Sequence, residues 1–356
     1  MNAVWLIIVV TLVLLVGLDG AVVSWLYELD DRPARLEIPT SDGWTVVAWH
    51  RAAEKRQFSV PIVLCHGLAN NHAFMEFRGE QNLAKYLAAA GFDCYSVDLR
   101  GAGGSLSPDD LPTDASVDDH VQYDVPAIIE AVCKHSGSSR VAWVGHSLGG
   151  VVAVAAASST LPKEKLAALV TIGTPVFFRL PRHLRSMLRW AKWLSPAGQF
   201  AASWARLIAP FAGRTPVPKI TDVTANLRNV SPLAQRYLLA NVFAPIWRGV
   251  IEQLDEWLAT DSFKSRDGKI DYRENIKTIE APTLVIGGTV DLLAPPDVTR
   301  DYFNLLTAPV RQLEMFGKSY GHSSEYGHGD LVIGMNAHTE VYPVIHHFLA
   351  ANLRDE

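Results

Sequence analysis

Residues 140–157 read RVAWVGHSLGGVVAVAAA, and this pattern governs the interpretation of the whole chain. The run Arg140–Val144 is short and apolar, which is typical of a strand buried on both faces. Residues 151–157 contain only Val and Ala and predict a helix of small residues. Between them lies Gly145-His146-Ser147-Leu148-Gly149, a G-x-S-x-G pattern. A strand, a tight turn and a helix are the setting in which this pattern forms a nucleophile elbow.

The context of this pattern matters, because G-x-S-x-G alone arises by chance in roughly one chain of this length in ten. In an elbow, the flanking glycines let strand and helix approach, and the turn holds the hydroxyl of Ser147 at the C-terminal edge of the sheet. The N-terminus of the following helix favours negative charge that develops there. His146 is adjacent to the serine on a sharp turn and is a poor candidate for its base, so we assign it a packing role.

Short apolar runs alternate with helical patterns on both sides of this segment. Strands are predicted at 35–39, 45–50, 60–65, 93–97, 140–144, 168–172, 283–286 and 310–315. Helices are predicted at 80–90, 120–135, 148–159, 296–306 and 339–352. A hairpin followed by repeating βα units predicts an α/β fold with a doubly wound, mostly parallel sheet.

One long interval, from Thr174 to Pro282, contains no obvious strand. Structureless loops of that length are uncommon in compact domains, so we predict a helical cap at 176–281, inserted into a core formed by 33–175 and 282–356. Residues 165–221 contain Arg, Lys and Trp but no Asp or Glu. A basic surface with aromatic side chains is typical of a membrane-surface element. A lid with inward-facing Trp and solvated Arg fits the same residues.

The N-terminus is a separate apolar segment, which begins with AVWLIIVVTLVLLVGL at 3–18 and continues beyond Asp19. About 20 such residues span the hydrocarbon layer of a bilayer, and here Asp19 would lie near an interface. We predict an uncleaved transmembrane anchor at 1–28 rather than a signal peptide, because no Lys or Arg precedes the run and no clear cleavage site follows it. Arg32 and Arg35 follow the segment, a small charge bias that favours the cytoplasmic side for the body of the protein.

The composition excludes several classes of function. The chain has 356 residues, is 49% hydrophobic and carries a net charge of -5, which is too apolar for disorder and lacks the basic excess of a nucleic-acid binder. Cys65, Cys94 and Cys133 lie in apolar stretches and are expected to be small buried residues. The motifs G-x-x-x-x-G-K-[ST] and His-Glu-x-x-His are absent, so no nucleotide, metal or organic cofactor is implied.

A serine hydroxyl needs a base that a third group orients, and the expected chain order is Ser, Asp, His. Asp291 follows the apolar run 282–288 and should emerge at the same sheet edge as Ser147. Its alternative role is that of a turn residue capping the helix that starts at 296. Downstream, two Gly-His steps offer His322 and His328 as candidates for the base.

Two hydrogen-bond donors are also needed for the oxyanion of a tetrahedral intermediate. We assign one to the backbone N–H of Leu148, directly after the serine. The other is expected in the loop after the strand at 60–65, where Gly67 lets the backbone approach a substrate, and we choose the N–H of Leu68. His66, in the same loop, is assigned a structural role.

These residues resemble the α/β-hydrolase superfamily over nearly the whole chain after Arg35. Four landmarks occur in the family's order: His66-Gly67, Asp98-Leu99-Arg100-Gly101 with Ser105, the elbow at 145–149, and 288–295 with Asp291. The ending at 326–334 looks like the branch that contains acid lipases and polyhydroxyalkanoate-synthase-like proteins. In that branch the catalytic histidine precedes an x-Asp step, which implies that His328 is the base and His322 the reserve.

The serine at position 147 sets the chain apart from two groups of that superfamily. The polymerising synthases carry Cys at the elbow, and haloalkane dehalogenases and epoxide hydrolases carry Asp. We therefore expect a membrane-anchored serine hydrolase that cleaves carboxylic esters with apolar acyl chains, small-molecule or lipid, through Ser147, Asp291 and His328. An acyltransferase with the same triad, and a non-catalytic hydrolase-fold protein that binds a lipid or a partner, are the alternatives.

Overall fold

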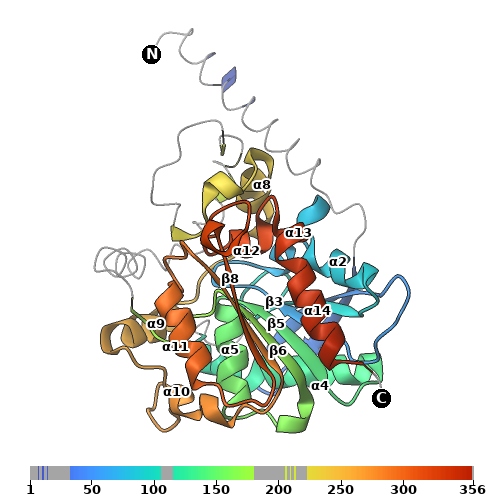
Figure 1. Cartoon of the computed structure of the whole chain (residues 1–356), viewed down its shortest axis with the longest axis vertical. Coiled ribbons are helices and arrows are strands. Elements are labelled where there is room, and N and C mark those ends of the chain that lie inside the picture. The colour runs from blue at the N-terminus through green and yellow to red at the C-terminus, as the bar shows by residue number, and fades with distance from the viewer. Residues whose placement is uncertain are drawn as a thin grey trace.

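The computed structural model describes residues 33–105, 115–179 and 223–354, together with isolated positions within 7–14 and 205–213. The described residues form an eight-stranded sheet with the order β1-β2-β4-β3-β5-β6-β7-β8 (Figure 1). The strands are β1 (Ala34–Pro39), β2 (Thr45–Arg51), β3 (Ile62–Cys65), β4 (Cys94–Asp98), β5 (Val141–His146), β6 (Leu166–Ile172), β7 (Thr283–Gly288) and β8 (Arg311–Phe316). The β1–β2 and β2–β4 pairs are antiparallel, and all other neighbours are parallel.

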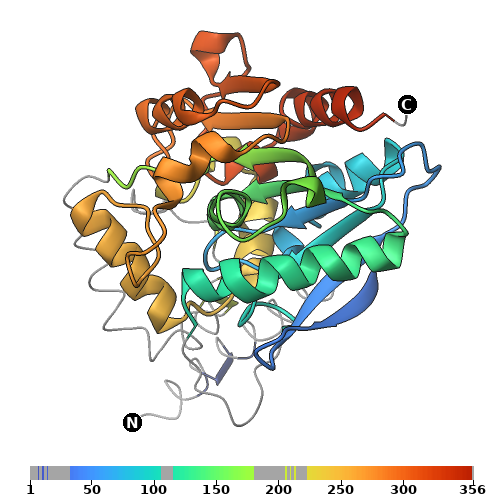
Figure 2. The same ribbon diagram turned by 90° about the horizontal axis from the view of Figure 1, so that it is seen from below.

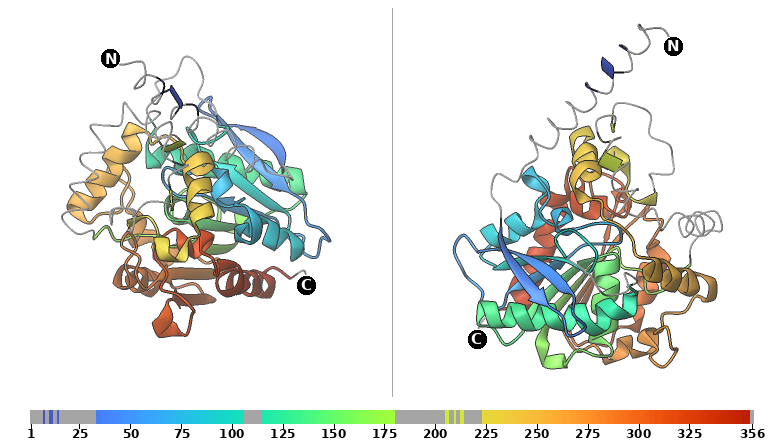
Figure 3. Two further views of the ribbon diagram at one scale, coloured as in Figure 1. Left: turned by 90° about the horizontal axis from the view of Figure 1, so that it is seen from above. Right: turned by 180° about the vertical axis from the view of Figure 1, so that it is seen from behind.

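This sheet confirms the predicted α/β architecture. All eight predicted strands are present, and their ends differ from the predicted ends by at most two residues. The first two strands form the predicted hairpin, which lies at one edge of the sheet, while β8 forms the other edge (Figure 3).

Helices cover both faces of the sheet (Figure 2). They are α2 (Leu83–Ala89), α3 (Val117–Asp119), α4 (Val125–Ser136), α5 (Leu148–Ala157), α8 (Pro232–Tyr237), α9 (Arg248–Thr260), α10 (Tyr272–Asn275), α11 (Pro296–Leu305), α12 (Asp330–Ile333), α13 (Ala337–Glu340) and α14 (Tyr342–Asn352). Side chains alternate along each strand between two cores. In β3, Ile62 and Leu64 join the core beneath α2 and α14, whereas Val63 and Cys65 join the core beneath α4, α5 and α11.

Prolines and caps explain where the predicted helix ends differ from the observed ones. The helix predicted at 120–135 begins earlier, at Val117, where Ser116 and Asp119 form a capping box. A π-helical turn follows at His120–Asp124, next to Pro126, which has no N–H to donate into the preceding turn. This helix ends at Gly137, whose φ of 78° is the left-handed conformation that glycine adopts readily. The helix predicted from residue 80 begins instead at Leu83, since the side chain of Asn82 accepts the N–H of Lys85.

Within the predicted cap, the described stretch 223–281 contains α8, α9 and α10 and none of the strands of the sheet. Trp257 on α9 is buried, and the ring of Trp247 packs edge-on against Trp44. These two tryptophans face inward, as in the lid interpretation. The other tryptophans of the predicted cap, at 190, 193 and 204, lie outside the described residues.

The N-terminal anchor predicted at 1–28 falls almost entirely outside the described residues. In the part of the chain that the structure covers, no helix has both the length and the apolar character that a bilayer crossing requires.

Candidate active site

The turn between β5 and α5 has the geometry of a nucleophile elbow. Ser147 adopts φ 51° and ψ -118°, a backbone conformation that residues other than glycine rarely adopt. The flanking glycines permit this turn: a Cβ on Gly145 would lie 2.4 Å from the carbonyl oxygen of Gly149, and a Cβ on Gly149 would lie 2.5 Å from that of Cys65. The strained conformation of Ser147 persists because the strand, the helix and the neighbouring loop pack closely around the turn and hold its backbone in place.

Asp291 lies on the loop that leaves β7, and its two carboxylate oxygens have different partners. One oxygen accepts the backbone N–H groups of Leu293 and Ala294, each at 2.8 Å. The other lies 2.9 Å from Nδ1 of His328. The carboxylate thus stabilises its own turn and contacts an imidazole, but it does not cap α11, whose start has no side-chain cap.

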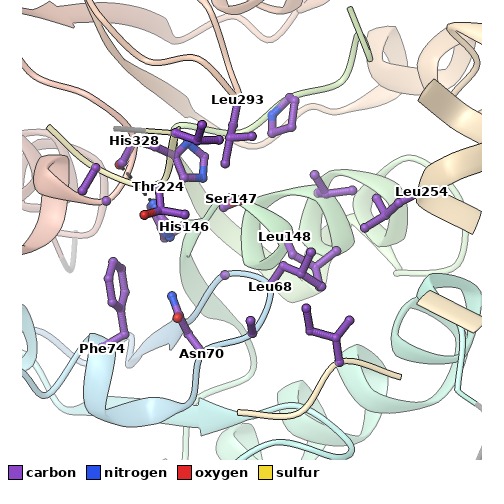
Figure 4. A pocket seen from close by; sticks show the side chains of 18 of the residues that line it. Leu68, Asn70, Phe74, His146, Ser147, Leu148, Thr224, Leu254, Leu293 and His328 are labelled. Atoms are coloured by element: carbon purple, nitrogen blue, oxygen red, sulfur yellow. Dashed lines mark hydrogen bonds between the residues drawn. The ribbon is translucent and has the colours of Figure 1, made fainter. Parts of the chain in front are cut away.

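The two candidate histidines occupy different surroundings. His328 is buried, and it lines the same cavity as Ser147 (Figure 4). His322 is half-buried, packs its ring on Phe316 with centroids 4.6 Å apart, and bonds to the backbone of Gly317. The structure therefore brings Ser147, Asp291 and His328 together and leaves His322 outside this group. The bond from Nδ1 of His328 to Asp291 leaves its Nε2 with a free lone pair.

Gly173, at the end of β6, keeps the space that this imidazole–carboxylate pair needs. Its φ is 55°, and a Cβ there would lie 3.1 Å both from Asp291 Oδ2 and from His328 Nδ1. No local pattern in the sequence pointed to this residue, because the close approach joins three separate loops.

His146 has a more specific contact than the packing role assigned from sequence. Its Nε2 lies 3.2 Å from the carbonyl oxygen of His328, and the two rings are 4.7 Å apart. Burial holds the pKa of His146 well below its usual value, so the ring is neutral and its Nε2–H donates to that carbonyl. His146 thereby anchors the backbone that carries His328.

Asp330 joins the His328 loop to the end of the cap. It is fully buried, and its carboxylate accepts the backbone N–H groups of Gly327 and Asn226 and the side-chain amide of Asn229. Gly329, between His328 and Asp330, donates its N–H to the carbonyl oxygen of Thr224 at 2.9 Å. The returning segment of the cap and the histidine loop are therefore hydrogen-bonded to each other through a buried carboxylate.

Replacing Asp330 by alanine should destabilise the protein. Two buried donors, on Gly327 and Asn229, and a half-buried one on Asn226 would lose their acceptor, and unpaired buried groups cost about 1–3 kcal/mol each. We expect a loss of about 3 kcal/mol in the free energy of unfolding, measured by calorimetry. Asp297→Ala, at an exposed site in the first turn of α11, is the matched control and should change stability by only a few tenths of a kcal/mol. Wild-type stability in Asp330→Ala would contradict the structural role of this carboxylate.

The two backbone donors predicted for the oxyanion lie on the same side of the serine. Leu148 is the first residue of α5, and Leu68 lies in the loop after β3; both line the cavity next to Ser147 (Figure 4). Neither N–H has an acceptor among the hydrogen bonds of the described residues. Orphan N–H groups at a helix start and an adjoining loop are suited to binding an anionic oxygen.

The cavity in front of Ser147 has a volume of about 280 Å³. Most of its lining side chains are Leu, Val, Phe, Ile, Ala or Pro, and none is Asp, Glu, Lys or Arg. Its polar side chains are those of Asn70, His146, Ser147, Thr224 and His328. Within the described ranges, no cluster of three His, Cys, Asp or Glu residues could hold a metal ion.

The remaining landmarks of the sequence support the loops around the site. His66 is buried, and its ring bonds to the carbonyl of Gly67 and accepts the N–H of Leu99, so its structural role is confirmed. Asp98 is buried and accepts hydrogen bonds from Trp49 and from His72. All three cysteines are buried and free, as expected.

Comparison with known proteins agrees with this geometry. The family model described as alpha/beta hydrolase fold matches residues 60–327. The chain belongs to the α/β-hydrolase fold family. Among solved structures of this fold, a thermophilic esterase from Thermogutta terrifontis superimposes with a TM-score of 0.61 at 18% identity, covering 90% of this chain and 99% of that one.

Curated relatives of this α/β-hydrolase-fold protein match it over only part of their own length. The poly(3-hydroxyalkanoate) polymerase subunit PhaC of Haloferax mediterranei is 22% identical over 79% of this chain and 59% of its own length. Lipase member N of Homo sapiens is 28% identical over 41% of this chain and 40% of its own. The chain thus spans less than two thirds of the length of either relative.

Proposed function

We propose that the protein is a serine hydrolase that cleaves carboxylic esters with apolar acyl chains. The observation that carries this proposal is a strained serine and a hydrogen-bonded His328–Asp291 pair at one end of a cavity that no Asp, Glu, Lys or Arg side chain lines. Lipase and esterase relatives support an ester substrate. The uncharged, apolar lining supports an acyl chain of the same character.

The reaction follows from the roles of these groups. Oγ of Ser147 attacks the acyl carbonyl carbon while Nε2 of His328 takes its proton, and the N–H groups of Leu68 and Leu148 hold the oxyanion. Asp291 keeps the imidazole oriented and stabilises its charged form. Collapse of the intermediate breaks the ester bond, and His328 returns the proton to the leaving alcohol. Water then attacks the acyl-enzyme by the same route and releases the acid.

A fluorophosphonate probe tests this proposal directly. The probe reacts with activated serines, so we expect stoichiometric labelling of the full-length wild-type protein at Ser147, located by peptide mass spectrometry. Labelling should be lost in Ser147→Ala and retained in a variant of a surface serine, Ser323→Ala. A folded wild-type protein that does not react would favour the non-catalytic alternative.

Acyl transfer is the second candidate, and the similarity to PhaC polymerase subunits favours it. The same acyl-enzyme would then be attacked by an alcohol or thiol in place of water. Analysis of products formed with added alcohols separates the two reactions, because transfer yields a new ester and hydrolysis yields only the acid.

We also propose that residues 1–28 anchor the protein in a membrane, with the body on the cytoplasmic side. The length and apolar character of the sequence there support the anchor, and the two arginines that follow support the orientation.

A further inference from the structure

The cavity in front of Ser147 has two sides that differ in polarity. One side is built from the core beneath α4 and α5 and is apolar throughout: Leu148, Val151, Phe178, Leu254 and Leu258. The other is built from the core beneath α2 and α14, with Phe74, Ala225, Leu238 and Ile333, and it also contains the polar side chains of Asn70 and Thr224. Figure 4 places Ser147 between these two groups, with Leu148 and Leu254 on one side and Phe74 and Asn70 on the other.

The position of His328 indicates which side receives which half of an ester. In the proposed hydrolysis, Nε2 of His328 delivers a proton to the leaving alcohol, so the alcohol must lie next to this ring. His328 borders the polar side: its neighbour Gly329 bonds to Thr224, and the His146 ring lies 4.7 Å from His328 and 4.7 Å from Phe74. The alcohol therefore belongs on the side of Asn70, and the acyl chain on the side of Leu254.

Asn70 brings a side-chain amide to this alcohol side without using it in the fold. Its backbone is held by a hydrogen bond to the carbonyl of Gly67 and by a bridge to Phe243. No side-chain hydrogen bond is formed by Asn70 within the described part of the chain, although it lines the cavity. The next residue differs, because the side chain of Asn71 accepts the N–H of Ala73 and donates to the carbonyl of Asn241.

Asn70 is half-buried, and a ligand that fills the cavity would remove its amide from water. A ligand group that satisfies the amide is then favoured, since a desolvated polar group without a partner is costly. The amide both donates and accepts, and a hydroxyl group is the small neutral group that does the same. A hydroxyl attached a short distance from the ester oxygen would reach Asn70 while the ester carbonyl faces Leu68 and Leu148.

We propose that Asn70 is a specificity-determining residue that selects esters whose alcohol portion carries a free hydroxyl close to the ester bond. Monoesters of diols or of glycerol belong to this class, and esters of simple alkanols do not. The proposal rests on the proposed ester hydrolysis and adds the chemistry of the leaving group to it.

A pair of isosteric substrates tests this proposal. Propyl octanoate and 2-hydroxyethyl octanoate have the same acyl chain and alcohols of nearly equal size. We expect the full-length wild-type enzyme to have a kcat/KM at least about 10-fold higher for the hydroxyethyl ester, measured by release of octanoic acid. In Asn70→Leu, which keeps the volume and removes the hydrogen bonds, this ratio should fall to about one. Asn352→Leu, at a half-buried amide on the distant helix α14, should keep the wild-type ratio.

Two results would overturn the assignment. The wild-type ratio could be one or less, or Asn70→Leu could keep the wild-type ratio. If that variant keeps the ratio while both kcat/KM values fall, the amide acts at the reaction centre instead. Fluorophosphonate labelling checks that each variant retains a reactive Ser147, and Asn70→Ala replaces the Leu variant if that one does not fold. A wild-type protein that is labelled but has no alcohol preference refutes only the role of Asn70, whereas one that is not labelled refutes the hydrolase itself.

Discussion

Replacing Ser147 by alanine is expected to lower kcat for hydrolysis of p-nitrophenyl esters by about 10⁴-fold or more, because no other group can form the acyl-enzyme. The loss should occur without unfolding, since alanine occupies the same space minus one oxygen. Stopped assays with p-nitrophenyl butyrate and octanoate measure the activity, and calorimetry measures the stability of the same preparations. Retained turnover in Ser147→Ala would end the proposal of a serine nucleophile.

Glycine at the same position provides a matched comparison. Alanine retains the strain of φ 51° at residue 147, whereas glycine adopts positive φ at no steric cost. We therefore expect Ser147→Gly to be equally inactive but more stable than Ser147→Ala by about 1 kcal/mol. Equal stability of the two variants would indicate that the surrounding loops do not force this geometry on the turn.

Replacing His328 by alanine is the second large effect, with an expected fall in kcat of about 10³-fold or more. This ring contacts Asp291 and lines the cavity with Ser147, so its loss removes the base and the proton donor together. His322→Ala is the control from the same loop. Its ring packs on Phe316 and bonds to backbone atoms, so we expect it to retain activity within a few-fold and to lose some stability. The opposite order of activities would transfer the role of base to His322.

Local sequence was sufficient for the architecture and for two of the three groups at the site. The strand, turn and helix around Ser147 are encoded within 18 consecutive residues, because burial on both faces, turn glycines and small helical residues each leave a local pattern. Asp291 was found in the same way, since carboxyl ends of parallel strands meet at one edge of the sheet. The predicted starts of two helices were less accurate, because they depend on single residues: Asn82 caps α2, and Pro126 lies in the first turn of α4.

Local sequence patterns do not distinguish between the two candidate histidines. His322 and His328 both follow a glycine in one loop, and from the residues alone either could serve. The resemblance to a known family favoured His328, and the contact with Asp291 distinguishes it physically.

Contacts between distant segments account for the rest of the site. His146 reaches the carbonyl of residue 328, Asp330 binds a segment about a hundred residues earlier, and Gly173 makes room for two other loops. Asn70 and Asn71 are the same amino acid in neighbouring positions, but the fold uses one amide and leaves the other facing the cavity. Chemical identity and periodicity are properties of neighbouring residues, whereas the pairing of a donor with its acceptor depends on which loops the packed sheet brings to the same edge.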